Sequence, residues 1–558
     1  MKRYATHRGL LGAATVASLL VLAPVVGLVV LALQGDKTLW PHLAAYVLPD
    51  AVRQTTLLLA GTAMVAGSAG VATAWMVTGF SFPGRRWLEW ALLLPLAMPT
   101  YIVAYSYMDV LHPIGPVQTT IRALLGIEDV RGLKLPDIRS MPGCIMVMGF
   151  ALYPYVYLSV RAALLMLSAE AIEAARGLGA AGSTLLRRVT LPIASPAIGV
   201  GLGLVMMDAL ADIGASEFLG VRTLTVAVYV TWTTRGSIEG AAQIALAMLL
   251  LTFALLAAER TLARRRDQGG GAGERVPLRT ELSGSAAAVA AICCATPLVI
   301  GFVVPAAHLL VNAGIRVAEF GLSPRLASWV WNSAALGATA TIATITVGFV
   351  IAFCHRYVNS VASIMLMRVS TLGYALPGTV LAVGLLGPMA WFDDAISHTV
   401  GVVGFIAAPI ISGSAAALVL AYLLRFLAIP VNTLESAYGR IPDSIDDAAR
   451  GMGAPEHALA LRIHLPLLTP ATVAAALLVM IECMKELPAT LLLRPLNVDT
   501  LATAIYAEAS RGTYEDGAVA ALAIVLVGLI PVIILIRGLK AGGSRMRRRG
   551  GSSALVRA

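Results

Sequence analysis

Two pairs of acidic residues lie inside apolar stretches of the sequence, where a charge is unusual. Asp208 and Asp212 belong to one stretch, and Glu482 and Glu486 belong to another stretch 274 positions later. Residues four apart share one face of a helix, and ionisable groups at membrane depth usually face a cavity, a partner or a pathway. We predict that these four carboxylates, with Glu217, line a translocation pathway that favours a cation. The alternative is that they lie near the outer ends of their helices, solvated or paired, with a structural role.

The sequence supports no other chemistry. The five cysteines show no C-x-x-C spacing and the eight histidines form no H-x-x-x-H or H-E-x-x-H pair, so neither a disulfide framework nor a zinc site is indicated. No G-x-x-x-x-G-K-[ST] motif occurs, so the chain has no P-loop for ATP phosphates. Clustered nucleophiles and bases are also lacking. We therefore expect a protein that is not an enzyme and that binds no cofactor or metal of its own.

The elements that carry the acidic pairs are predicted to be membrane-spanning helices. The chain of 558 residues is 58% hydrophobic and 13% charged, with a mean hydropathy of +0.82, which lies outside the range of soluble globular domains. A bilayer core needs about 20 apolar residues per helix. Runs of that length occur near residues 9–33, 55–79, 88–109, 142–166, 192–215, 240–258, 284–312, 332–354, 364–390, 401–424, 466–490 and 516–537. The sequence therefore predicts an all-α integral membrane protein with about 12 transmembrane helices.

The basic residues indicate how the chain is oriented. If the amino terminus is cytoplasmic, most of the 41 Lys and Arg residues lie in or beside the cytoplasmic segments, as the positive-inside rule requires. The net charge of +10 thus reflects membrane topology rather than nucleic-acid binding. The run Gly9–Leu33 is too long for a signal peptide and is predicted to be a retained helix. We expect a multi-pass protein of the bacterial cytoplasmic (inner) membrane with both termini in the cytoplasm.

One motif occurs twice, in the loops that follow the fourth and tenth apolar runs. The first copy reads E-A-A-R-G-L-G from Glu173, and the second reads D-A-A-R-G-M-G from Asp447. A Leu-Pro pair follows each copy at the same spacing, and matched positions differ by 274, which indicates an internal duplication. Alanine gives each motif a small, close-packing helical surface, and Gly179 or Gly453 permits a sharp turn.

These segments resemble the EAA loop of ABC importer permeases, in which Glu-Ala-Ala is followed by a glycine and later by Leu-Pro. The second copy departs from the pattern because Asp447 replaces the glutamate, which keeps the carboxylate but shortens its reach. In that family the loop forms short coupling helices that dock on the ATPase subunit. The resemblance implies this role for Glu173, Ala174, Ala175, Gly179, Asp447, Ala448, Ala449 and Gly453.

The resemblance also implies the partners. They are two copies of an ABC ATPase subunit that hold ATP and magnesium, a periplasmic substrate-binding protein and the lipid bilayer, without any nucleic acid. The resemblance further implies that transport follows alternating access. It also implies a fold of two parallel six-helix repeats of the type I importer permease, fused in one chain.

Over nearly its whole length the chain resembles the ferric-iron permeases of this family. Leu93–Pro99 (L-L-P-L-A-M-P) and Met484–Pro495 (M-K-E-L-P-A-T-L-L-L-R-P) are among the stretches that carry the resemblance. It implies ferric iron as the cargo, while thiamine, a phosphonate or another small solute stays open, because the binding protein largely sets selectivity. A proton-coupled secondary transporter is the alternative from another class, although it leaves the doubled loop unexplained.

The repeat divides the chain into four parts. They are a first permease half at 1–259 with its EAA loop at about 169–192, a cytoplasmic linker at 260–283, a second half at 284–540 with its loop at about 443–466, and a basic cytoplasmic tail at 541–558. Pro99 and Pro377 occupy matching places in the third and ninth apolar runs. Because proline removes a helical hydrogen bond, each predicts a kink that is either a gating hinge or a static bend.

Overall fold

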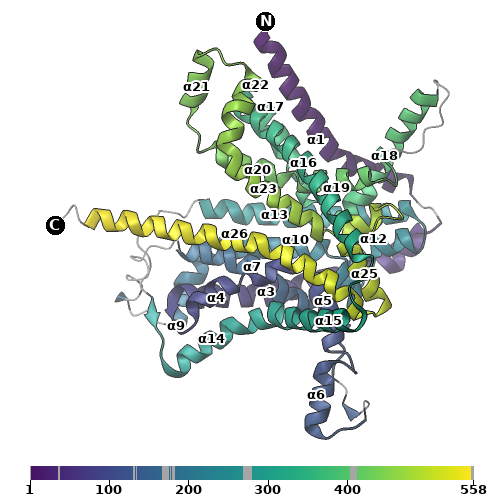
Figure 1. Ribbon diagram of the computed structural model, residues 1–558, viewed down its shortest axis with the longest axis vertical. Helices are drawn as coiled ribbons and strands as arrows, with labels where there is room; N and C mark the ends of the chain where they lie inside the picture. The colour runs from purple at the N-terminus through teal and green to yellow at the C-terminus, as the bar shows by residue number, and fades with distance from the viewer. Residues whose placement is uncertain are drawn as a thin grey trace. The chain divides into compact units, whose positions relative to one another are not determined.

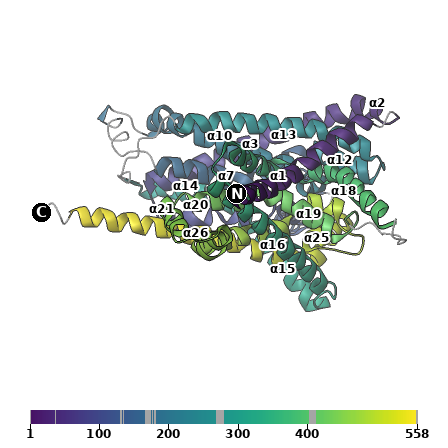
Figure 2. The same ribbon diagram turned by 90° about the horizontal axis from the view of Figure 1, so that it is seen from above.

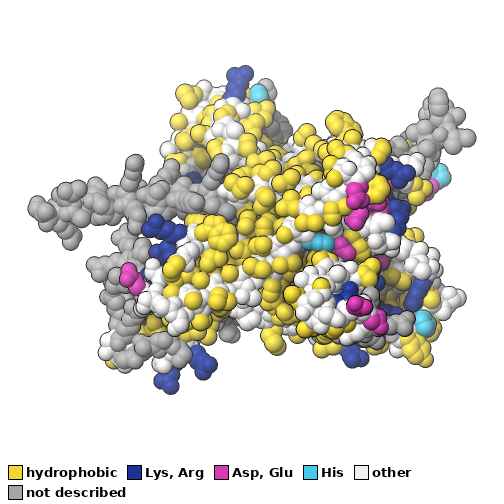
Figure 3. Space-filling model, turned by 60° about the horizontal axis from the view of Figure 1, so that its bottom comes forward, with side chains coloured by type: hydrophobic (Ala, Val, Ile, Leu, Met, Phe, Trp, Pro, Cys, Tyr) yellow, Lys and Arg dark blue, Asp and Glu magenta, His cyan; other side chains and the backbone are white. Residues whose placement is uncertain are grey.

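The protein is almost entirely helical. The computed structural model describes residues 2–35, 38–129, 132–133, 135–165, 175, 177–178, 182–267, 279–401 and 411–554. Ten helices in these ranges are long and apolar enough to cross a membrane, or up to 12 when each of two bent helix pairs counts as one span. The strands described, β1 (Phe80–Ser81) and β2 (Thr280–Glu281), form one short parallel pair. The predicted all-α membrane fold is therefore confirmed, and apolar side chains cover much of the surface in Figure 3.

The helices form two compact units, and neither unit is a continuous part of the chain. The first comprises Met1–Thr55, Arg222–Phe253 and Leu322–Ala507, and the second comprises Thr56–Val221, Ala254–Gly321 and Glu508–Ala558. Each sequence half therefore contributes helices to both units. Residues 260–283 separate the two repeats in the sequence, but the two compact units are not divided at that point.

The first unit joins the amino-terminal helix to helices of the second sequence half. Helix α1 (Lys2–Gln34) packs against α16 (Leu326–Val358), α17 (Val361–Ser370) and α18 (Gly378–Gly401), as Figures 1 and 2 show. The other elements of this unit are α2 (Trp40–His42), η1 (Leu43–Val47), α12 (Leu224–Thr233), the first part of α13 (Ile238–Asp267), η6 (Leu372–Ala375), α19 (Ala415–Phe426), α20 (Ala428–Tyr438), α21 (Asp443–Gly451), α22 (Glu456–Ala458), η7 (Leu459–His464), α23 (Leu465–Lys485), α24 (Pro488–Leu493) and most of α25 (Leu501–Arg511).

The second unit is built in a related way, with helices from both ends of the chain. Helix α7 (Met141–Leu165) packs on α10 (Leu191–Ala211), and α15 (Val304–Phe320) packs on α26 (Tyr514–Ala554). Its other elements are most of α3 (Leu48–Gly79), α4 (Arg85–Ala91), η2 (Leu94–Ala97), α5 (Thr100–Val110), α6 (Pro116–Leu125), α9 (Gly182–Leu185), η4 (Leu186–Thr190), α11 (Gly214–Phe218), α14 (Gly284–Leu298) and η5 (Val299–Val303).

The duplication is visible in the element boundaries. Helices α10 and α23 both begin and end 274 positions apart, and α3 and α16 begin 278 positions apart. Matched positions therefore shift from an offset of 278 to one of 274 between the early and the late helices of each half. These two offsets identify equivalent residues in the helices that they relate, and the offset of later elements is established from their own contacts.

Pro99 and Pro377 lie between helices rather than inside them, which corrects the prediction of a kink within one helix. Pro99 separates η2 from α5, and the two parts of this broken span differ in direction by 93°. Pro377 lies between η6 and α18. Proline disfavours helical backbone at the preceding residue, and Met98 and Leu376 are extended, with ψ of 114° and 123°. Whether either break moves during transport stays a prediction.

The contact between α1 and α18 depends on two glycines. A Cβ atom at Gly27 would overlap the carbonyl oxygen of Gly384, and one at Gly384 would overlap the carbonyl oxygen of Pro24. Small residues allow membrane helices to approach at their backbones. The amino-terminal helix is therefore held in the first unit by close backbone packing.

Replacing Gly27 with leucine should push α1 away from α18. We expect a loss of unfolding free energy on the order of 1–3 kcal/mol, because the added atoms overpack a close helix contact. Thermal unfolding of the detergent-solubilised protein measures the effect. Gly12→Leu is the matched control, because Gly12 lies on the same helix and a Cβ there meets nothing within 4 Å. Equal effects of the two substitutions would contradict this account of the contact.

Candidate functional site

The second copy of the repeated motif forms the short helix α21. Asp447 is 74% exposed and lies 3.6 Å from the guanidinium of Arg450, and Ala448 is also exposed. Ala449 is buried against a cluster that includes Phe353 and Leu459. Gly453 then turns the chain with φ of 77°, a backbone conformation that glycine adopts without strain. The helix thus turns one small face inward and presents Asp447 and Ala448 outward.

A buried carboxylate next to the motif fastens this helix to the rest of the unit. Asp446 Oδ2 accepts a hydrogen bond from Arg356 Nε at 2.9 Å, and its Oδ1 accepts one from His464 Nε2 at 2.8 Å. Arg356 lies in the last turn of α16, His464 ends η7, and Arg356 also pairs with Asp443 at 2.7 Å. Burial alone would raise the pKa of Asp446, but the hydrogen bonds and positive charge of these partners lower it below its usual range.

Aromatic side chains complete the attachment. The ring of His464 lies between Phe353 and Tyr438, at centroid distances of 5.6 and 5.3 Å. Tyr357 lies under the guanidinium of Arg450 at 5.1 Å and donates a hydrogen bond to Glu456 Oε1 at 2.8 Å. Helix α21 is therefore tied to α16 and η7, and η7 runs directly into the membrane helix α23.

The sequence analysis did not identify Asp446, because it considered only the residues of the motif, and the motif begins one residue later at Asp447. A signal was present, since Asp446 and Ala449 are three apart and share a helical face. That face is the buried one.

The first copy of the motif does not have the residues for such a network. The positions equivalent to Arg356, Asp446 and His464 are Thr78, Ile172 and Thr190. Glu173, Ala174 and Gly179 lie outside the described residues, while Ala175 is half-buried. Both copies nevertheless present a large apolar side chain at one equivalent position, with Leu178 90% and Met452 80% exposed. The two motifs therefore share this exposed apolar position and differ in the residues that could anchor them.

Asp212 and Glu486 occupy equivalent breaks in the membrane helices. Each follows the last residue of a long helix and is extended, with ψ of 127° and 120°. The Asp212 carboxylate accepts the backbone N–H groups of Ala215 and Ser216, which open α11. The Glu486 carboxylate accepts those of Ala489 and Thr490, which open α24. Both carboxylates thus cap the short helix that follows a break.

The remaining partners of these two carboxylates differ between the copies. Glu486 pairs with Arg425 at 2.8 Å, and its side chain is 1% exposed. Asp212 instead accepts a hydrogen bond from the hydroxyl of Thr100. The first-copy position equivalent to Arg425 is Ala151.

Glycine makes room for the second-copy ion pair. Gly378 is the residue equivalent to Thr100. A Cβ atom at Gly378 would overlap both Arg425 and the Glu486 carboxylate. One copy therefore uses a threonine hydroxyl where the other uses an arginine and an empty glycine position.

The other predicted pathway residues lie in more open surroundings. Asp208 is exposed, Glu217 is half-buried in α11, and Glu482 pairs with Lys485 at 2.7 Å. Within the described residues, no group of three or more His, Cys, Asp or Glu side chains could hold a metal ion. The structure therefore gives Asp212 and Glu486 a capping role, and their contact with a cargo stays a prediction.

Comparison with known proteins places these features in context. The sequence model of one family, described as binding-protein-dependent transport system inner membrane component, matches residues 66–268 and again residues 344–547. A Fe(3+)-transport system permease protein of Haemophilus influenzae is 22% identical over 87% of this chain and 89% of that protein. A probable ABC transporter permease protein of Sinorhizobium fredii is 24% identical over 87% of this chain and 86% of that protein.

Shorter relatives align with a smaller part of the chain. A molybdenum transport system permease protein of Escherichia coli is 28% identical over 36% of this chain and 87% of that protein. A sulfate transport system permease protein of the same species is 30% identical over 33% of this chain and 63% of that protein.

Asp446→Asn should destabilise the protein, whereas Asp447→Asn should not. The first substitution weakens the hydrogen bonds that the buried Asp446 carboxylate accepts from Arg356 and His464, which costs on the order of 1–3 kcal/mol. Asp447 pairs with the exposed Arg450, so loss of this surface ion pair should cost less than about 0.5 kcal/mol. Thermal unfolding of both variants at neutral pH gives the comparison.

The lowered pKa of Asp446 also predicts how the effect of Asp446→Asn on stability depends on pH. The folded-state pKa of Asp446 is lowered, so its stabilisation is complete above the ordinary aspartate pKa of about 3.9 and is lost as the pH falls through the folded-state pKa. The stability difference between the unaltered protein and Asp446→Asn should therefore shrink only in acid. A difference that shrinks between pH 6 and pH 8 would contradict this assignment.

A transplant of the first-copy cap tests the role of the second. Glu486→Ala should cost about 3 kcal/mol or more, because it leaves the half-buried Arg425 without its carboxylate partner and uncaps α24. Combining Gly378→Thr, Arg425→Ala and Glu486→Asp recreates the Thr100–Asp212 arrangement and should recover most of that loss. Glu482→Ala, one turn earlier, should cost less than about 1 kcal/mol. Thermal unfolding is again the measurement, and a triple variant as unstable as Glu486→Ala would overturn the capping account.

Proposed function

Because the chain belongs to the family of binding-protein-dependent transport system inner membrane components, we propose that it is the fused permease of an ABC importer for ferric iron. The family region occurs twice and covers most of the chain. This membership makes the chain an ABC importer permease of the inner membrane, with both transmembrane halves in one polypeptide. The family match also favours ATP-driven transport over the proton-coupled alternative.

The observation that carries the proposal is the doubled coupling motif in a doubled permease. Helix α21 presents Asp447, Ala448 and Met452 outward while its other face is fastened by Asp446. Leu178 is the exposed equivalent of Met452. A small helix with one exposed apolar side chain suits a groove on a partner protein, so each motif is proposed to dock one ATPase subunit. One chain then recruits two ATPase copies, which hold ATP and magnesium, while the chain itself binds no cofactor.

The attachment of α21 suggests how ATP closure reaches the membrane. When the two ATPase subunits close, they draw the coupling helices together. Because Asp446 joins α21 to the end of α16 and to η7, movement of α21 displaces α16 and α23 with it. Such a rigid connection is a physical means of alternating access. Both termini are proposed to be cytoplasmic, and the binding protein is proposed to deliver its cargo on the opposite side.

The choice of iron rests on similarity over the full length. The ferric-iron relative aligns with 87% of this chain, whereas the molybdenum and sulfate relatives align with about a third of it. A cationic cargo also agrees with acidic residues such as Asp208 and Glu217 near the ends of the membrane helices. Another small solute, such as thiamine or a phosphonate, is the alternative within the same class.

Uptake by reconstituted protein tests the proposal. Proteoliposomes would contain this chain with its genomically adjacent ATPase, and the matching binding protein would be loaded with radioactive ferric iron. We expect uptake that requires both ATP and the binding protein and that survives a protonophore. Excess molybdate, sulfate, thiamine or a phosphonate should not compete.

The outcomes separate the cargo from the mechanism. ATP-dependent uptake of one of the competitors in place of iron would keep the importer and remove iron. Uptake that continues without ATP, or that stops with the protonophore, would contradict ATP-driven transport itself. An ATPase variant that binds but does not hydrolyse ATP is the matched control.

A further inference from the structure

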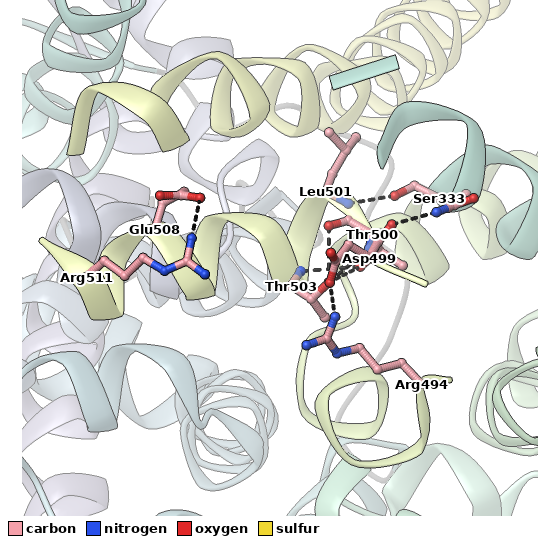
Figure 4. Close-up of polar contacts among 9 residues, drawn as sticks. Ser333, Arg494, Asp499, Thr500, Leu501, Thr503, Glu508 and Arg511 are labelled. Carbon is pink, nitrogen blue, oxygen red and sulfur yellow. Dashed lines mark hydrogen bonds and ion pairs between the residues drawn. The ribbon is translucent and has the colours of Figure 1, made fainter. Parts of the chain in front are cut away.

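Helices α12 and α25 are short, equivalent elements that follow the two capped breaks. The backbone N–H of Leu224, which opens α12, donates to Thr55 Oγ1 at 2.9 Å. The N–H of Leu501, which opens α25, donates to Ser333 Oγ at 2.8 Å (Figure 4). Leu224 and Leu501 are 277 positions apart, and Thr55 and Ser333 are 278 apart. The same hydrogen bond therefore anchors the same helix in both copies.

Two further contacts support this alignment. Thr223 and Thr500 cap their helices, each accepting the N–H three residues on at 3.3 Å. The side-chain amides of Gln54 and Asn332 also occupy equivalent positions, and each bonds to the backbone of the residue just before the cap, at 2.8 and 2.9 Å. The equivalence of α12 and α25 is thus fixed by matched hydrogen bonds as well as by sequence.

In this alignment Tyr229 of α12 is the equivalent of Tyr506 of α25, and the two side chains touch. Their ring centroids are 6.2 Å apart and the rings meet edge to face at 84°. Both residues are half-buried and belong to the same compact unit. When two equivalent residues of a duplicated fold contact each other, the axis that relates the copies passes between them. The tyrosine pair therefore marks the local twofold axis that relates α12 to α25.

We propose that Tyr229 and Tyr506 form the gate of the translocation pathway on the periplasmic side. This inference rests on the proposed function. In transporters built from repeats, the substrate pathway lies at the interface of the repeats, and α12 and α25 meet as one helix from each repeat. An aromatic pair between these two helices lies across the path of a cargo.

The order of the elements gives the side of the membrane. Helix α10 begins just after the first coupling motif and has 21 residues, enough to cross the apolar core at 1.5 Å per residue. Helix α12 follows it and precedes α13, which returns across the membrane. By the same order, α25 lies between α23 and α26. Both tyrosines therefore lie toward the side opposite the coupling motifs.

The strength of the contact suits a gate. An edge-to-face aromatic pair contributes stabilisation beyond its buried area. One such pair favours closure in the resting state, yet it is weak enough for a larger conformational change to separate it. The anchors at Thr55 and Ser333 hold the amino ends of the two helices, so opening requires the helices to separate at the tyrosines.

Cross-linking tests the gate directly in the full complex. The chain would carry Tyr229→Cys and Tyr506→Cys and a specific protease site within residues 268–278, so that the two fragments stay joined after cleavage only when cross-linked. A short bifunctional maleimide should join them efficiently without nucleotide. Cross-linking should fall several-fold when a non-hydrolysable ATP analogue and the binding protein are present. The same chain with its five native cysteines alone gives the background.

Substitutions give a second readout that does not depend on the introduced cysteines. Tyr229→Ala with Tyr506→Ala should raise leakage of cargo without ATP by about fivefold, which corresponds to the loss of about 1 kcal/mol of closure. Tyr229→Phe with Tyr506→Phe keeps both rings and should leave leakage low. Equal cross-linking with and without nucleotide, in a complex whose ATPase still responds to the binding protein, would overturn the gate and leave the importer intact. A complex whose ATPase never responds would instead count against the proposed function.

Discussion

The structure depends on satisfying the backbone where a membrane helix is interrupted. The bilayer core offers no water, so each free N–H group at a break needs a partner within the protein. Asp212 and Glu486 supply that partner at equivalent positions, each accepting two backbone N–H groups of the helix that follows. These caps allow α11 and α24 to begin where the preceding long helix ends, and α12 and α25 follow them along the chain. The acidic residues that first suggested cargo chemistry thus have a structural task.

The two copies have diverged in how they carry out shared tasks. The first copy supports its cap with the Thr100 hydroxyl, whereas the second uses Arg425 and keeps Gly378 free of a side chain. A buried ion pair needs excellent geometry to offset desolvation, and the glycine provides the space for it. The repeated motif shows a similar difference, because the first copy has Ile172 at the position equivalent to Asp446. Duplication therefore left one architecture with two sets of supporting residues.

Much of this could be read from the sequence. Helix length and hydropathy predict the all-α membrane fold, and a fixed spacing between matched motifs predicts the repeat. Hydropathy cannot detect a cap, so the sequence predicts continuous helices through Asp212 and Glu486 and a kink rather than a break at Pro99. The exchange of helices between compact units also leaves no local signal, because it depends on surfaces such as Gly27 against Gly384. Contacts between residues far apart in the sequence, such as Tyr229 with Tyr506, could be identified only from the three-dimensional structure.

The central claim is that one polypeptide supplies both coupling sites of the importer. The most direct test is native mass spectrometry of the complex purified from membranes after co-expression with the ATPase. The account predicts one 58.1 kDa chain with two ATPase subunits. A complex that holds two of these chains with two ATPase subunits would contradict it, because each chain would then use a single coupling motif.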